Sequence, residues 1–83
     1  MTTPIPDTGA LGALIRAERQ AQGLRQPDLA AAAGTSVRFI VEVERGKPTA
    51  RIGKVFDVLR QLGLELRLSG PGGAALSPPD DDA

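Results

Sequence analysis

Residues 26–45, QPDLAAAAGTSVRFIVEVER, decide the fold that the sequence predicts. Pro27 and the alanine-rich run after it indicate a first short helix, because proline is tolerated in the first turn of a helix. Gly34 can adopt the positive φ that a tight turn requires. Ser36 is a good N-cap for a second helix, which we expect to extend to Arg45. The stretch therefore predicts two short helices joined by a tight turn, the arrangement called a helix-turn-helix.

Two further helices are expected on either side of this pair. Apolar residues at helical spacing predict them at residues 11–22 and 50–62, with Thr49 as the N-cap of the second. Within the pair, the first helix should take Gln26 as its cap and Pro27 as its first residue, since a residue before proline disfavours helical geometry. The helices should share one core, formed by Leu11, Leu14, Ile15, Leu29, Ala30, Ala33, Ile40, Val43, Ile52, Val55, Phe56, Leu59 and Leu62.

A short β-strand is expected after the last helix. Leu64, Leu66 and Leu68 alternate strictly with charged residues, which is the pattern of a half-buried strand. No other segment of the sequence has this pattern, and an isolated strand leaves its backbone groups unpaired. We therefore expect the strand to pair with its copy in a second chain about a two-fold axis, giving a homodimer. The alternative is an extended tail packed on the last helix.

The predicted fold is thus mainly α, with four helices and one C-terminal strand in a single domain. A chain of 83 residues is long enough for one domain only. We expect residues 1–8 to be a flexible arm, residues 9–69 to form the domain and residues 70–83 to be a disordered acidic tail. Residues 11–69 hold ten basic and six acidic side chains, a formal charge of +4 that is compatible with phosphate binding.

The residue inventory disfavours an enzyme and a metal site. The sequence has no histidine, cysteine or tyrosine, which removes the usual general bases and the commonest metal ligands. Glu42 and Glu44 lie two positions apart on a predicted helix and therefore point to different faces. We expect no catalysis, no cofactor and no metal. The N-terminus does not resemble a signal peptide and no apolar run is long enough to cross a membrane, so the prediction is a cytoplasmic protein.

A helix-turn-helix places its second helix in the major groove of DNA, which assigns candidate binding residues. Arg38 can form paired hydrogen bonds with guanine O6 and N7, and Val37 can contact a thymine methyl group. The candidates for reading bases are Ser36, Val37, Arg38, Val41 and Glu42. The candidates for phosphate contacts, at the helix ends nearest the DNA backbone, are Arg25, Gln26, Lys47 and Arg51. The alternative for each charged side chain is a solvated surface residue.

The sequence resembles the lambda-repressor-like, XRE-type helix-turn-helix family. The matching residues are Leu11-Gly12, Ile15-Arg16, Arg19, Gly23-Leu24, Gln26, Leu29-Ala30, Gly34, Ile40, Val43-Glu44 and Gly46-Lys47. The resemblance implies a buried structural ion pair between Arg19 and Glu44. It also implies that Gln26 opens its helix and touches a phosphate. The sequence departs from the family at Arg25, where many members have threonine or serine, and at Pro27.

A narrower resemblance, to HipB-like antitoxins, lies in the run ERGKPTARIGKVFDVLRQLGLELRL at residues 44–68. It implies that the strand pairs across a dimer and that the dimer binds a palindromic operator, repressing its own operon. It further implies a HipA-like kinase toxin as a partner, in a type II toxin–antitoxin operon of a bacterium, with the bound protein on the nucleoid. The two resemblances together cover residues 11–68.

Two other functions remain open at this stage. One is a stand-alone phage-like or metabolic repressor, which the absence of a ligand-sensing domain disfavours. The other is a protein-interaction adaptor that kept the fold and lost DNA binding. The formal charge of zero for the whole chain and the apolar residues Val37, Phe39, Ile40 and Val41 favour the adaptor slightly.

Overall fold

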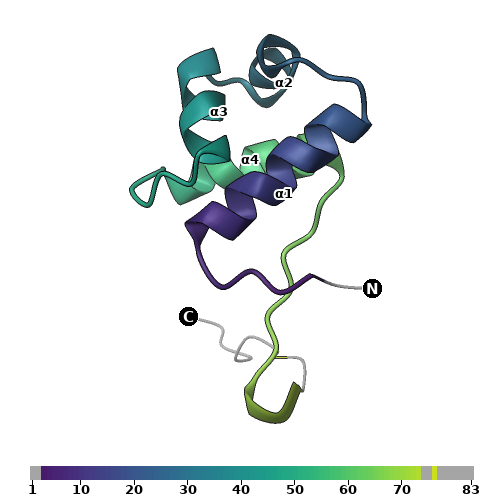
Figure 1. The fold of residues 1–83 in the computed structure, drawn as a ribbon, viewed down its shortest axis with the longest axis vertical. Helices are drawn as coiled ribbons and strands as arrows, with labels where there is room; N and C mark the ends of the chain where they lie inside the picture. Colours follow the sequence, from purple (N-terminus) through teal and green to yellow (C-terminus); the bar gives the residue numbers. More distant parts are fainter. Residues whose placement is uncertain (1–2, 74–75, 77–83) are drawn as a thin grey trace, which may run out of the picture.

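The structure is a computed structural model that describes residues 3–73 and 76. Four α-helices follow one another, with α1 lying across α4 and the pair α2 and α3 packed beside them (Figure 1). A short 3-10 helix, η1, comes after them. The bounds are α1 Thr8–Ala21, α2 Gln26–Ala33, α3 Val37–Glu44, α4 Ile52–Leu62 and η1 Pro71–Gly73. The predicted four-helix fold class is confirmed.

All four helices contribute to one hydrophobic core. Its buried members are Ile15, Leu29, Ala30, Ile40, Val43, Val55, Val58, Leu59 and Leu62. Three residues predicted for the core lie outside it: Ile52 and Phe56 are 68% and 40% exposed, and Leu14 is half-buried. Val58, which was not predicted for the core, is fully buried. The apolar stripe of α4 is wider than the surface that the other helices cover, and the side of α4 at Val58 faces them. Sequence period alone cannot choose between the two sides of such a stripe.

The first helix begins three residues earlier than predicted, because its N-cap is Asp7. The Asp7 carboxylate accepts a hydrogen bond from the backbone N–H of Ala10 at 2.8 Å. Thr8, predicted to be the last residue of the flexible arm, is the first residue of α1. Its hydroxyl donates to the carbonyl of Gly46 at 2.8 Å and so fastens the start of α1 to the turn after α3.

The entry to α2 also differs from the prediction. Arg25, and not Gln26, is the N-cap, and Gln26 is the first helical residue. The backbone N–H of Arg25 donates to the carboxylate of Asp28 at 2.8 Å, which stabilises this start one residue earlier. The predicted end of α2 is confirmed, since Gly34 has a φ of 70°. The predicted cap of α3 is confirmed as well: Ser36 Oγ accepts from the N–H of Phe39 at 3.0 Å.

The last helix starts later than predicted. Thr49 lies in the turn that precedes α4, and the helix begins at Ile52 with Arg51 as its N-cap. The backbone N–H of Ala50 donates to the carbonyl of Lys47 at 3.4 Å, so the chain is still turning where the sequence predicted a helix. Gly63, with a φ of 73°, ends α4 as expected.

After α4 the chain leaves the helical body as an extended segment (Figure 1). Residues 64–68 form no paired strand within the described part of this single chain. Leu66 is 40% exposed and Leu68 is 77% exposed. Pairing with a second chain, which the prediction of a strand requires, stays a prediction. The predicted acidic tail lies mostly outside the described residues.

The contact between α1 and α3 is very close. A Cβ atom added at Gly12 would lie 2.3 Å from the carbonyl oxygen of Val43. Only glycine fits there, because real side chains do not approach a backbone oxygen so closely. None of the helices in residues 3–73 is long and apolar enough to span a bilayer.

Candidate nucleic-acid interface

One side of α3 faces away from the core and carries the predicted base-reading residues. Ile40 and Val43 are buried and anchor the helix. Val37 is exposed and the Arg38 side chain is 86% exposed. The side chains of the other three candidates are partly engaged or covered. Ser36 caps the helix, and Val41 and Glu42 are half-buried.

Glu42 lies between two cations on this outward side. Its carboxylate accepts a hydrogen bond from Arg38 Nε at 3.3 Å and one from Lys47 Nζ at 3.2 Å. The hydrogen bond and charge of Lys47, followed by those of Arg38, hold the pKa of Glu42 below its ordinary value. The three side chains therefore form an ordered group with a net charge of +1. We call Arg38, Glu42 and Lys47 the α3 charge group.

A basic hollow of about 210 Å³ lies on one side of α3, between its first turns and the start of α4. The hollow is lined by the α3 charge group, by Phe39, and by two further cations, Arg51 and Lys54. The ammonium of Lys54 lies 5.9 Å from the centre of the Phe39 ring, a cation–π distance. Lys47 and Arg51 were predicted as phosphate contacts and share this hollow, whereas the sequence interpretation missed Lys54. Its spacing of three residues from Arg51 was the available signal.

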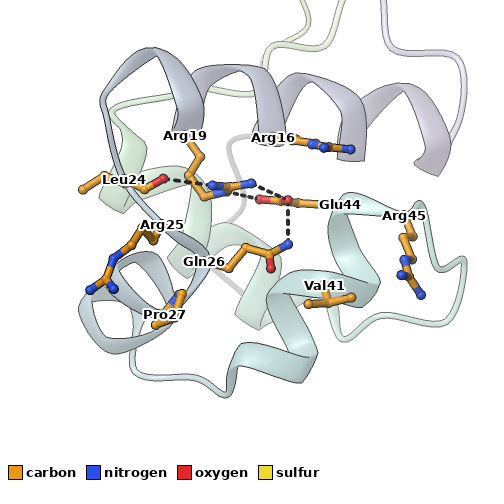
Figure 2. Close-up of a pocket in the computed structure, with 9 residues that line it drawn as sticks. All are labelled: Arg16, Arg19, Leu24, Arg25, Gln26, Pro27, Val41, Glu44 and Arg45. Carbon is orange, nitrogen blue, oxygen red and sulfur yellow. Dashed lines mark hydrogen bonds and ion pairs between the residues drawn. The ribbon is translucent and has the colours of Figure 1, made fainter.

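A second, larger hollow of about 540 Å³ lies on the other side of α3, between α1, the start of α2 and the last turn of α3 (Figure 2). The pair of Arg19 and Glu44 forms its floor. Arg19 Nε and Nη2 donate to the two Glu44 oxygens at 2.6 and 3.0 Å, and Arg19 Nη1 donates to the carbonyl of Leu24 at 2.8 Å. The hydrogen bond with Glu44 raises the pKa of Arg19. With side chains only 9% and 3% exposed, the pair is held inside the domain.

The other two predicted phosphate residues, Arg25 and Gln26, lie at this larger hollow and are already engaged. Gln26 Nε2 donates to Glu44 Oε1 at 3.1 Å, which extends the buried pair into a three-residue network (Figure 2). The guanidinium of Arg25 donates to both oxygens of Asp28, at 3.1 and 3.0 Å. This contact raises the pKa of Arg25 and lowers that of Asp28.

Two exposed arginines that the sequence interpretation did not select, Arg16 and Arg45, also line the larger hollow (Figure 2). Arg16 is three residues before Arg19, so the two share a face of α1. Arg45 follows Glu44 directly as the C-cap of α3. Their closeness in sequence to the ion pair was the signal available, but the pattern alone did not separate them from ordinary surface arginines.

The two hollows flank the outward side of α3. Val41 and Glu44 line the larger one, and Phe39 and Glu42 line the smaller one. A major groove likewise lies between two phosphate backbones, about 12 Å apart. A helix that binds in the groove contacts the bases with its own side chains. Cations on both sides of the groove contact the phosphates and hold the helix in position. Among the described residues, no group of three or more metal-ligating side chains is placed to hold a metal ion.

Comparison with known proteins identifies the family of the chain. Residues 15–68 match a family model described as helix-turn-helix. The chain is 49% identical over 72 residues to the uncharacterized HTH-type transcriptional regulator y4mF of Sinorhizobium fredii (strain NBRC 101917 / NGR234), a match that covers 87% of this chain and 95% of that protein.

Two solved structures have the same fold, each at 23% identity over 84% of this chain and 99% of theirs. A HipB–O4 20mer complex superposes with a TM-score of 0.77, and a HipA–HipB–O2–O3 complex with a TM-score of 0.78. The resemblance to the XRE-type helix-turn-helix family is thereby confirmed, and the fold is that of HipB. The chain belongs to the helix-turn-helix family of transcriptional regulators, in its XRE-type branch.

Proposed function

We propose that the chain is a sequence-specific DNA-binding repressor and, more narrowly, the antitoxin of a type II toxin–antitoxin operon that represses its own promoter. The observation that carries the DNA-binding part is the outward side of α3, with the exposed Arg38, between two basic hollows. The outward side of α3 can contact base edges in the major groove, and the cations of the two hollows can contact the phosphate backbones on either side of it. Contacts with bases and phosphates require no catalytic group, and we do not propose an enzyme.

In this proposal α3 enters the major groove with its N-terminal half. Arg38 pairs with guanine O6 and N7, which discriminates against other bases by about 1–3 kcal/mol. Val37 contacts a thymine methyl group, and Ser36, Val41 and Glu42 complete the base-reading set. Phosphates are contacted on one side of α3 by Lys47 and Arg51 and on the other side by Arg25 and Gln26.

The proposed active form is a homodimer on a palindromic operator. Two recognition helices related by a two-fold axis would enter successive major grooves, about 34 Å apart. Pairing of residues 64–68 with their copy would bury Leu66 and Leu68, which a single chain leaves exposed. The exposed Ile52 and Phe56 on α4 offer further apolar area to the same or a second interface.

The antitoxin role rests on likeness of fold and on the HipB-like run at residues 44–68. One of the similar structures is a complex that contains HipA as well as HipB. We propose a HipA-like kinase toxin as the second protein partner, bound in the bacterial cytoplasm while the antitoxin occupies DNA on the nucleoid.

DNA binding is tested by titrating the purified chain against its own promoter and against an unrelated duplex of equal length, at two salt concentrations. We expect selective, steeply salt-dependent binding to the promoter. Equal, weak affinity for both duplexes would instead support the protein-interaction adaptor.

The antitoxin role is tested separately. The product of a neighbouring kinase-like gene is co-expressed with a tagged form of the chain, and the complex is isolated by size exclusion. Promoter binding without a stable complex, or without such a gene, would support the stand-alone repressor.

A further inference from the structure

Two cations at the larger hollow have no ion-pair partner among the described residues. Arg16, on the face of α1 that carries Arg19, and Arg45, at the end of α3, are both exposed. Neither takes part in any salt bridge within residues 3–73. Figure 2 shows them at the rim, with Glu44 between them and Arg25 at the opposite side of the hollow.

The remaining charges of the hollow cancel one another. Arg19 and Glu44 form a buried pair, and Gln26, which carries no charge, donates one of its two amide hydrogens to the same carboxylate. Arg25 is paired with Asp28 at 3.0 Å. The hollow therefore has a net charge of +2, which comes from Arg16 and Arg45 alone.

The start of α2 is a poor anion site in this protein, although helix N-termini usually favour anions. Asp28 already places a carboxylate in the first turn, where it accepts from the N–H of Arg25. Pro27, the second residue of α2, has no N–H to donate. On the α2 side, a phosphate at the larger hollow would thus lie near the Asp28 carboxylate and would lack the backbone N–H that Pro27 does not have. Arg25 and Gln26, already bonded to Asp28 and Glu44, can add only a weaker contact there, so the main partners of the phosphate are the guanidinium groups of Arg16 and Arg45.

We propose that Arg16 and Arg45 hold a phosphodiester of the DNA backbone at the mouth of the larger hollow, on the side of the major groove opposite Lys47 and Arg51. Guanidinium groups bind phosphate oxygens in pairs of hydrogen bonds, which suits them to this contact. Because one arginine belongs to α1 and the other to the end of α3, the phosphate would tie the recognition helix to the body of the domain. This inference rests on the proposed DNA binding and assigns two contacts to it.

The test compares Arg16→Gln, Arg45→Gln and the double variant with Arg60→Gln. Arg60 is a matched control, because its exposed side chain pairs with Asp57 on α4 and lies at neither hollow. Binding to the promoter and to an unrelated duplex is measured over a series of salt concentrations. Thermal unfolding of each variant confirms that it is folded.

The double variant loses one phosphate contact in each protomer of the dimer and should reduce the slope of log K against log salt by about 2, and each single substitution should reduce it by less. Affinity for both duplexes should fall by the same factor, since a phosphate contact carries no sequence information. Arg60→Gln should keep the wild-type slope. An unchanged slope in the double variant, with selective promoter binding intact, would overturn the two contacts and leave the proposed function standing.

Failure of the proposed function has a different signature, because the unaltered chain would then show no selectivity for its promoter. A free anion as the true ligand is distinguished by titrating inorganic phosphate at constant ionic strength. Displacement of DNA by millimolar phosphate from the unaltered chain, but not from the double variant, would mean that the arginines form a small-anion site. That outcome also overturns the inference.

Discussion

Arg19 and Glu44, which are 25 positions apart in the sequence, join α1 to the last residue of α3 through two hydrogen bonds of 2.6 and 3.0 Å. Gln26 adds the start of α2 to the same carboxylate. Three helices are therefore fixed relative to one another by one polar cluster at the edge of the apolar core. The angle at which α3 presents its outward side depends on this cluster.

Removing one partner of the pair should destabilise the domain strongly. We expect Arg19→Ala or Glu44→Ala to lower the free energy of unfolding by about 3–5 kcal/mol, because a buried charge is left alone. Urea unfolding followed by circular dichroism measures the change. Arg19→Met combined with Glu44→Leu should be much less harmful, since no uncompensated charge remains. Equal losses for the single and double variants would contradict a buried ion pair.

Gly12 should not tolerate a methyl group. The Cβ of Gly12→Ala would meet the Val43 and Glu44 carbonyl oxygens at 2.3 and 2.8 Å, and the backbone of α3 would have to move. We expect a loss of about 1–3 kcal/mol in the free energy of unfolding. Gly53→Ala is the matched control, because its Cβ meets nothing within 4 Å on another helix. It should stabilise the protein by up to about 1 kcal/mol. The expectation fails if the two substitutions have the same sign.

Glu42 should contribute to the acid sensitivity of the fold. Lys47 lowers the pKa of Glu42 in the folded chain below its ordinary value of 4.5. The stability that the contact gives is therefore complete above pH 4.5 and is lost as the pH falls through the lowered value. Glu42→Gln should make the urea midpoint less dependent on pH in this acidic range. Glu65→Gln, a change on the exposed extended segment, is the control. No difference between the two variants would show that the contact is not formed in solution.

Arg38 and Lys47 should separate base selectivity from general affinity. Arg38→Ala should reduce the preference for promoter over unrelated DNA by about 5- to 150-fold, equivalent to about 1–3 kcal/mol. Lys47→Ala should weaken binding to both duplexes equally and reduce the salt slope by about 1 for each protomer, or about 2 for the bound dimer. Fluorescence anisotropy at several salt concentrations gives both quantities. Unchanged selectivity in Arg38→Ala would mean that α3 is not the groove-reading helix.

The leucines of residues 64–68 should decide the oligomeric state. We expect Leu66→Glu combined with Leu68→Glu to convert a dimer to a monomer in sedimentation velocity, because charges would replace the face that pairs. Arg67→Glu, on the alternate side of the segment, should leave the dimer intact. Operator affinity should fall with the dimer. If the unaltered chain sediments as a monomer at micromolar concentration, the proposed strand pairing is wrong.

The helix-turn-helix could be predicted from the sequence because its signals are local. Gly34 and Ser36 have roles that depend only on backbone geometry, and both were assigned correctly. Ile52 and Phe56 were misplaced because helical period defines an apolar stripe and not the part of it that neighbouring helices cover. The start of α2 was misplaced because the contact between Arg25 and Asp28 is a side-chain arrangement that proline rules do not include.

The candidate site was harder to predict than the fold, because its cations gather from distant parts of the chain. Arg16 and Arg45 meet only when α1 and α3 are packed together, so neither formed part of a visible basic run. The segment at residues 64–68 is a different case, since the strand predicted for it needs a second chain to pair with. For that segment the sequence pattern predicts a pairing that the structure of one chain cannot contain.

The buried and exposed residues of α3 are different residues, and this separation has a consequence for the evolution of such a protein. Ile40 and Val43 secure the helix from below, while the side chains of Val37 and Arg38 project outward and contribute nothing to the buried core. Substitutions at positions 37 and 38 by other helix-forming residues therefore leave the packing of the core unchanged. If α3 reads bases as proposed, duplicated copies of the gene could acquire new operators by substitution at these two solvent-facing positions while the fold stays the same.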